Sequence, residues 1–97
     1  MPAPTDAGVR ADGDALAFAG ALDRPAVASL WPAALKAIGT ARRLDLRAVS
    51  HVDSAGLALL AELAARIGAG VRVEGDPPGL AELRAAYRLT PDLAFDT

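Results

Sequence analysis

The middle of the sequence passes directly from a strand pattern into a helix pattern that is apolar on most of its surface. Residues 43–49 alternate in polarity, as in a strand with one buried face, and residues 54–67 have helical periodicity. The face expected to meet the core carries Leu59, Leu60, Leu63 and Ile67. A second, nearly flat apolar arc carries Leu57, Ala58, Ala61, Ala64 and Ala65. Such a helix needs burial on more than one side, and a chain of 97 residues can supply little of a second layer.

A hairpin is predicted at the start of the chain. Short strands are expected near residues 9–11 and 16–18, and the turn sequence Asp-Gly-Asp at 12–14 joins them. Gly20 is expected to end the second strand.

The first helix is predicted to begin after Asp23, which can cap it, and to end at Gly39. Pro32 lies inside this helix. Because proline lacks the N–H that would bond to the carbonyl of Ala28, we expect a kink, or a short first turn followed by a restart.

The C-terminal third predicts one more strand and one more helix. Residues 71–73 favour a short strand, residues 75–79 form a turn, and residues 80–87 form a helix that stops near Thr90-Pro91. The order of elements is therefore strand, strand, helix, strand, helix, strand, helix.

This order predicts the α/β class, because parallel strands joined by helices form a sheet with helical crossovers. We expect a single domain with a small mixed β-sheet and helices mainly on one face, since the strands alternate in polarity. Residues 1–8 are expected to form a flexible N-terminal tail and residues 9–97 the domain.

The composition argues against several classes of function. A net charge of -2 disfavours nucleic acid, which requires a basic surface. Cysteine is absent and His51 is the single histidine, so disulfides, thiol chemistry and a multi-histidine metal site are excluded. Residues 1–14 do not resemble a signal peptide, and the longest apolar run, 57–61, is too short to span a bilayer. We expect a cytoplasmic protein without cofactor and without direct membrane insertion.

The junction between the central strand and helix has the sequence Asp-Ser-Ala-Gly-Leu at residues 53–57. Ser54 is expected to be the N-cap of the helix, because a serine hydroxyl can accept a hydrogen bond from a first-turn N–H. Asp53 would lie next to the positive end of the helix dipole. Gly56 would permit another backbone to approach the first turn closely.

This junction resembles the D-[ST]-x-G-L signature of STAS domains, a family named for sulfate transporters and anti-sigma factor antagonists. Leu46, Val49 and Val52 on the preceding strand agree with the same pattern. The sequence Leu-Ala-Phe-Ala-Gly-Ala-Leu-Asp at residues 16–23 is similar to the second strand of the family and its G-x-L-D turn. The resemblance covers residues 9–90 and implies the STAS fold.

Two groups of STAS proteins are similar to this chain. In anti-sigma factor antagonists the serine after the aspartate is a phosphorylation switch, and Ser54 occupies that position. The solitary STAS subunit of the Mla phospholipid transporter is similar over residues 53–60, at Leu30-Trp31, and over residues 86–89 followed by Pro91. Ala86 departs from this second pattern, because a leucine is expected there.

The second resemblance implies a non-catalytic subunit that binds and supports the ATPase of a phospholipid-transporting ABC complex, which maintains outer-membrane lipid asymmetry. Such a subunit binds no nucleotide itself and is peripheral to the inner membrane through its partner. The alternative is an anti-sigma factor antagonist that is regulated by phosphorylation of Ser54.

The partner-binding surface is expected to lie on the first half of the central helix. Its predicted residues are Asp53, Ser54, Gly56, Leu57, Ala58 and Ala61. Leu57 is expected to be exposed, so that Leu57→Arg weakens the complex and keeps the fold. The alternative is that the flat face reflects composition alone, because the chain is rich in alanine, which is the best helix former.

Catalysis is not predicted. His51 and Ser54 are three residues apart, but a nucleophile and its base must meet in space, with a third group that orients the base. The chain also lacks a G-x-S-x-G elbow. We therefore assign no catalytic residue and no metal ligand.

Overall fold

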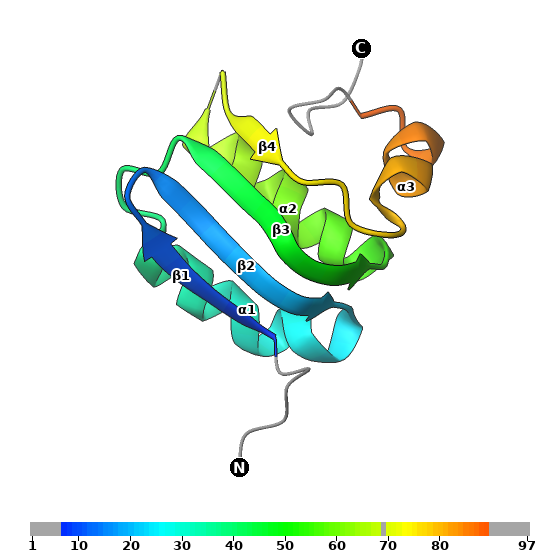
Figure 1. Ribbon diagram of the computed structural model, residues 1–97, viewed down its shortest axis with the longest axis horizontal. Coiled ribbons are helices and arrows are strands. Elements are labelled where there is room, and N and C mark those ends of the chain that lie inside the picture. The colour runs from blue at the N-terminus through cyan, green and yellow to red at the C-terminus, as the bar shows by residue number, and fades with distance from the viewer. Residues whose placement is uncertain (1–6, 69, 90–97) are drawn as a thin grey trace.

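The predicted alternation of strands and helices is present in a computed structural model, which describes residues 7–68 and 70–89 (Figure 1). The elements are β1 (Gly8–Asp12), β2 (Ala15–Leu22), α1 (Arg24–Ala37), β3 (Arg43–Val52), α2 (Ser54–Ile67), β4 (Arg72–Glu74) and α3 (Leu80–Ala86).

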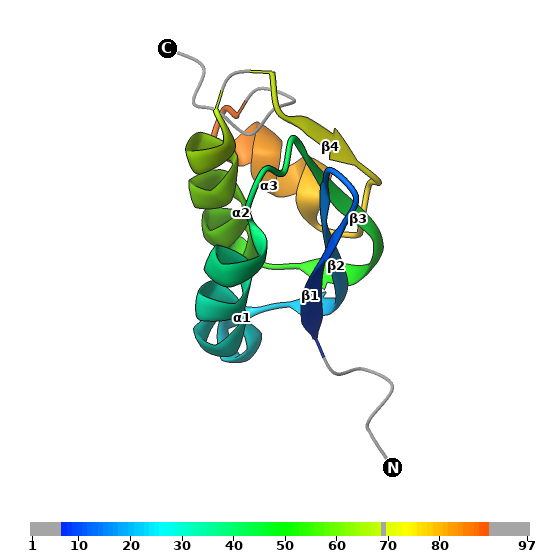
Figure 2. The ribbon, with the colours of Figure 1, turned by 90° about the vertical axis from the view of Figure 1, so that its left-hand side faces the viewer.

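The four strands form one mixed sheet in the order β1-β2-β3-β4. β1 and β2 are the predicted antiparallel hairpin, whereas β3 lies parallel to β2 and β4 lies parallel to β3. α1 and α2 form a layer against one face of the sheet, as Figure 2 shows. The expected α/β architecture, with a small mixed sheet and helices mainly on one face, is confirmed.

The hydrophobic core fills the space between the sheet and this helical layer. The sheet contributes large side chains from its two central strands, namely Leu16, Phe18, Leu22, Leu44, Leu46, Val49 and Val52. The helices contribute Leu30, Ala34, Leu57, Leu59, Leu60, Leu63, Ala64 and Leu80. Burial of one leucine or valine side chain stabilises the fold by about 1.5–3 kcal/mol. Phe18 is the one buried aromatic residue among those described, so leucine and valine supply most of the hydrophobic stabilisation of the core.

The two central strands continue beyond their predicted C-terminal ends. β2 continues through Gly20 to Leu22, and β3 continues past Val49 to Val52. The parallel pairing of the two strands extends over these residues and ends with Leu22 opposite Val52. The register between β2 and β3 has irregularities, one of them just after Gly20, and these allow the strand pairing to continue where the local sequence favoured the end of the strand.

Helix α1 begins as predicted, because the Asp23 side chain accepts a hydrogen bond from the N–H of Ala26 at 3.1 Å. The predicted restart at Pro32 is wrong, since one helix runs from Arg24 to Ala37. Pro32 is exposed, whereas Leu30 and Ala34 are buried on the opposite side. The burial of this face offsets the one hydrogen bond that proline removes.

At the N-terminus, Gly8 is the first residue of β1. Of the predicted flexible tail, residues 1–6 lie outside the described residues. The stop predicted near Thr90-Pro91 also lies outside them, and α3 ends at Ala86.

Candidate docking site

The N-cap of α2 is Asp53, and the prediction that Ser54 would cap the helix is wrong. Asp53 has extended backbone angles, and its Oδ1 accepts a hydrogen bond from the N–H of Gly56 at 2.9 Å. Ser54 is the first helical residue and is exposed. The aspartate takes the capping position because the strand ends one residue earlier than a serine cap would require.

The Asp53 carboxylate also reaches the first helix. Its Oδ2 accepts a hydrogen bond from the main-chain N–H of Arg24, the first residue of α1, at 3.1 Å. One side chain therefore caps α2 and joins it to the start of α1. The hydrogen bond from Gly56, and then that from Arg24, hold the pKa of Asp53 below its usual value of 3.8, because they stabilise the ionised form.

Gly56 lies where α2 crosses the end of β2. A Cβ atom at this position would lie 2.0 Å from the carbonyl oxygen of Leu22, so only glycine fits without moving the backbone. The N–H of Asp53 donates to the same carbonyl at 3.1 Å. The close approach predicted for Gly56 is therefore made within the chain, to its own second strand.

Leu57 is part of the core. Its residue surface is only 3% exposed, and the prediction that it would be exposed is wrong. Leu57→Arg should therefore destabilise the fold, contrary to the expectation from the sequence, because arginine would place an unpaired charge among aliphatic side chains. Of the remaining arc, Ala64 is buried and Ala61 is half-buried, whereas Ala58 and Ala65 are exposed.

A small apolar groove lies beside the first two turns of α2. It has a volume of about 200 Å³ and is lined by Ser54, Leu57, Ala58, Ala61, Tyr87 and Leu89. Tyr87 is 49% exposed, the highest exposure of a large hydrophobic side chain among the described residues. We call Ser54, Ala58, Ala61, Tyr87 and Leu89 the docking surface.

The chain reaches this groove through a turn that follows α3. Arg88 has a φ of 56°, in the left-handed region that non-glycine residues rarely adopt. The turn is closed by a hydrogen bond from the N–H of Leu89 to the carbonyl of Arg84 at 2.9 Å. It places Tyr87 and Leu89 next to α2, although about thirty residues separate them from Ser54 in sequence.

Tyr87 and Leu89 were not predicted as site residues. Both belong to the closing segment of residues 86–89 that supported the family resemblance. That segment was the available signal, but its position next to α2 depends on the turn at Arg88.

No group of three or more histidine, cysteine, aspartate or glutamate residues that could hold a metal ion occurs within residues 7–68 and 70–89. In the same part of the chain, every helix is too short or too polar to cross a bilayer. His51 lies exposed near the end of β3, on the strand that leads to Asp53.

The fold and the capped strand-to-helix junction define a small α/β domain of the STAS class. A family model described as "Mlab, STAS domain" matches residues 7–93, and the chain belongs to this family. This confirms the resemblance inferred from the junction.

Two relatives share the same degree of similarity. The proteins named "Intermembrane phospholipid transport system binding protein MlaB" in Escherichia coli (strain K12) and in Shigella flexneri are each 36% identical to this chain over 84 residues. The matched region covers 84% of this chain and 87% of each relative.

Proposed function

We propose that this protein is a non-catalytic STAS subunit of an intermembrane phospholipid transport system, and that it binds the ATPase of an ABC complex through the docking surface. The transport system is inferred from the names of the two relatives. The observation that carries the docking proposal is the apolar groove between α2 and the turn after α3.

The docking surface has the properties of a helix-packing site. Ser54, Ala58 and Ala61 have small side chains, which let the backbone of a partner helix approach α2 closely. Tyr87 borders these residues with an aromatic ring, a type of side chain that is enriched among the residues that dominate interface energies. A partner side chain that fills the groove would cover apolar surface that is exposed to solvent in the isolated chain.

The six residues predicted from the sequence divide into two roles in this proposal. Ser54, Ala58 and Ala61 contact the partner. Gly56 and Leu57 pack α2 against the rest of the domain, and Asp53 caps the helix. Asp53 is also partly exposed at the edge of the surface. The subunit would then act in the cytoplasm, held at the inner membrane by its partner and not by insertion of its own.

Affinity for the ATPase tests the proposal. Ala58→Arg should weaken binding about 100-fold or more, because a charge is placed without a partner in a desolvated contact. The fold should be kept, since Ala58 is exposed. Ala65→Arg is the matched control, since Ala65 is exposed on the same helix, two turns from Ala58, and does not line the groove. It should change the affinity less than about threefold.

The measurement is co-purification of the tagged chain from its source cells, followed by a titration of the isolated ATPase. Loss of binding in both arginine variants would contradict the assignment of this surface, as would equal binding by both. Recovery of partners that contain no ATPase would contradict the function itself.

A second function is supported by the exposure of Ser54. The hydroxyl is not needed for capping, because Asp53 caps the helix, and it is therefore accessible to a kinase. In this alternative, phosphorylation of Ser54 regulates an anti-sigma factor antagonist by adding a charge of about -2 to the docking surface. Mass spectrometry of the chain purified from its source cells tests it, and the absence of phosphate on Ser54 in growing and starved cells would eliminate it.

A further inference from the structure

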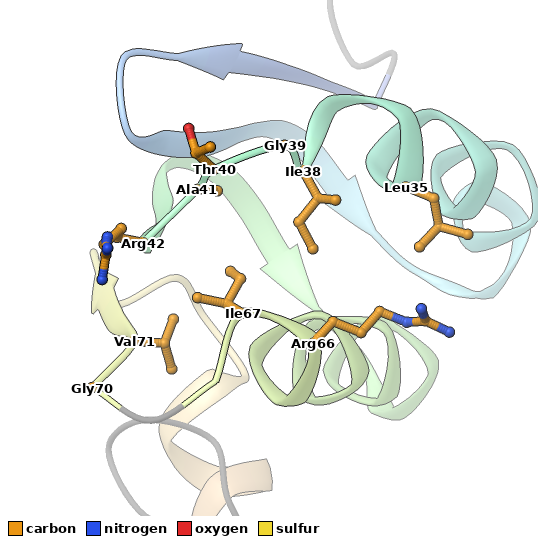
Figure 3. A pocket seen from close by; sticks show the side chains of 10 residues that line it. All are labelled: Leu35, Ile38, Gly39, Thr40, Ala41, Arg42, Arg66, Ile67, Gly70 and Val71. Carbon is orange, nitrogen blue, oxygen red and sulfur yellow. The ribbon is translucent and has the colours of Figure 1, made fainter.

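A second groove lies at the other end of α2 (Figure 3). It runs between the last turns of α1 and α2 and has a volume of about 640 Å³. We call it the distal groove, and its main residues are Leu35, Ile38, Arg42, Arg66, Ile67 and Val71. Ser54 of the docking surface and Ile67 of the distal groove are at opposite ends of α2, about 20 Å apart along the helix.

The middle of the distal groove is aliphatic. Figure 3 shows the side chains of Ile38 and Ile67 directed toward one another from the ends of α1 and α2. Val71 is buried at the base, whereas Leu35, Ile38 and Ile67 are only half-buried. The sequence had placed Ile67 in the core. Its partial exposure leaves apolar surface that a ligand could cover with a gain in free energy.

An arginine stands at each end of the distal groove (Figure 3). Arg42 is exposed, and its backbone is held by a hydrogen bond from its N–H to the carbonyl of Asp14 at 2.8 Å. Arg66 is half-exposed, and its guanidinium lies 3.5 Å from the carboxylate of Glu62 and 5.3 Å from the centre of the Trp31 ring. These contacts orient Arg66 before any ligand binds.

Positive charge gathers around this groove on a chain that is acidic overall. This end of the molecule holds Lys36, Arg42, Arg43, Arg66 and Arg72, of which Arg43 contacts Asp14 and Glu74 and Arg66 contacts Glu62. Among the described residues, those that line the groove include no aspartate or glutamate. Because the described lining has two arginines and no carboxylate, the groove would attract an anionic ligand although the whole chain has a net charge of -2.

We propose that the distal groove binds an acidic segment of a protein partner, in which a large apolar side chain is flanked by carboxylates. The apolar side chain lies between Ile38 and Ile67, and the carboxylates pair with Arg42 and Arg66. The groove is open to solvent along its length, whereas sites for small molecules enclose most of their ligand. A segment of a larger partner is therefore the occupant that fits. This inference does not depend on the proposed transport function.

Selection of a random heptapeptide display library on the full chain tests the proposal. The enriched peptides are expected to carry aspartate or glutamate on both sides of a large apolar residue. The best of them is then synthesised with fluorescein and titrated by fluorescence anisotropy. Shifts of backbone amide signals on binding should be concentrated in residues 38–42, 66–68 and 70–71.

Variants at Arg42 give the quantitative test, because its side chain is exposed and its removal should spare the fold. Arg42→Glu should weaken peptide binding about tenfold or more, and Arg42→Lys less than about threefold. Arg10→Glu is the matched control. It makes the same change of charge on the exposed strand β1, away from the groove, and should leave the affinity unchanged.

Three results with the peptide would overturn the proposal. They are enrichment of peptides without acidic residues, equal affinity of Arg42→Glu and the original chain, and amide shifts confined to the docking surface. Shifts of the groove amides with protein concentration, without peptide, would assign the groove to a second copy and would also overturn it. Ala58→Arg should bind the peptide normally, so failure of the docking proposal remains distinguishable from failure of this one.

Discussion

The two helices that cover the sheet have the same length and the same kind of N-cap, but very different burial. α1 and α2 each have 14 residues and begin after an aspartate. α1 buries only Leu30 and Ala34, whereas α2 buries six residues. α2 packs against α1, α3 and the central strands, while α1 lies toward the β1 edge. The helix that carries the docking surface is thus the one that the core holds most firmly.

A comparison of the two helices position by position shows where this difference arises. Asp23 and Asp53 are thirty residues apart, and so are Ala26 and Gly56, whose N–H groups donate hydrogen bonds to these aspartates. Leu57 is buried, whereas the residue at the same place in α1, Val27, is only half-buried. The first turn of α2 is therefore pressed against the sheet, and that of α1 is not.

The largest expected effect comes from the pair Leu57 and Val27. Leu57→Ala should lower the free energy of unfolding by about 3 kcal/mol, because it removes buried methyl groups and leaves a cavity. Val27→Ala should cost about 1 kcal/mol, since that side chain is already partly in water. Urea denaturation followed by circular dichroism measures both. Equal costs would mean that the two helices are held equally.

The pair Gly56 and Ala26 should show a somewhat smaller difference. Gly56→Ala should cost about 2 kcal/mol, because the new methyl group meets the Leu22 carbonyl and the helix must shift, despite the better helix propensity of alanine. Ala26→Gly should cost about 1 kcal/mol through helix propensity alone. Thermal unfolding of the two variants compares them. A stabilising Gly56→Ala would show that α2 does not approach β2 as closely as described.

The smallest expected effect concerns the charge of Asp53. Because its folded pKa lies below 3.8, the unfolded chain takes up the proton first as the pH falls. The stability that the ionised carboxylate contributes is complete above the unfolded pKa and is lost as the pH falls through the folded pKa. Asp53→Asn keeps a capping side chain but should remove this acid-dependent part, no more than about 1 kcal/mol for a partly exposed group.

Denaturation of Asp53→Asn in urea at several pH values below 5 measures this effect. Asp23→Asn is the control, because Asp23 accepts its side-chain hydrogen bond within α1, whereas Asp53 joins the two helices. An unchanged pH dependence in Asp53→Asn would show that the link between the helices carries no charge-dependent stability.

Much of the candidate site could be read from the sequence in outline, but not in its detail. The strand-to-helix junction at residues 53–57 was identifiable because a strand pattern, a capping residue, a glycine and a helix pattern follow one another. The role of each residue was less predictable. Serine and aspartate are both good N-caps, and only the end of β3 decides that Asp53 takes this position.

Local patterns in the sequence determined the order of the elements, the hairpin, the cap at Asp23 and the α/β class, because these depend on neighbours along the chain. Only the tertiary structure decided that Leu57 belongs to the core while Ile67 stays half-exposed, because burial depends on what other elements place around a residue. It also brought Tyr87 and Leu89 to α2 through the left-handed turn at Arg88. A helical wheel shows which residues share a face, but only the packed neighbours show which face is covered.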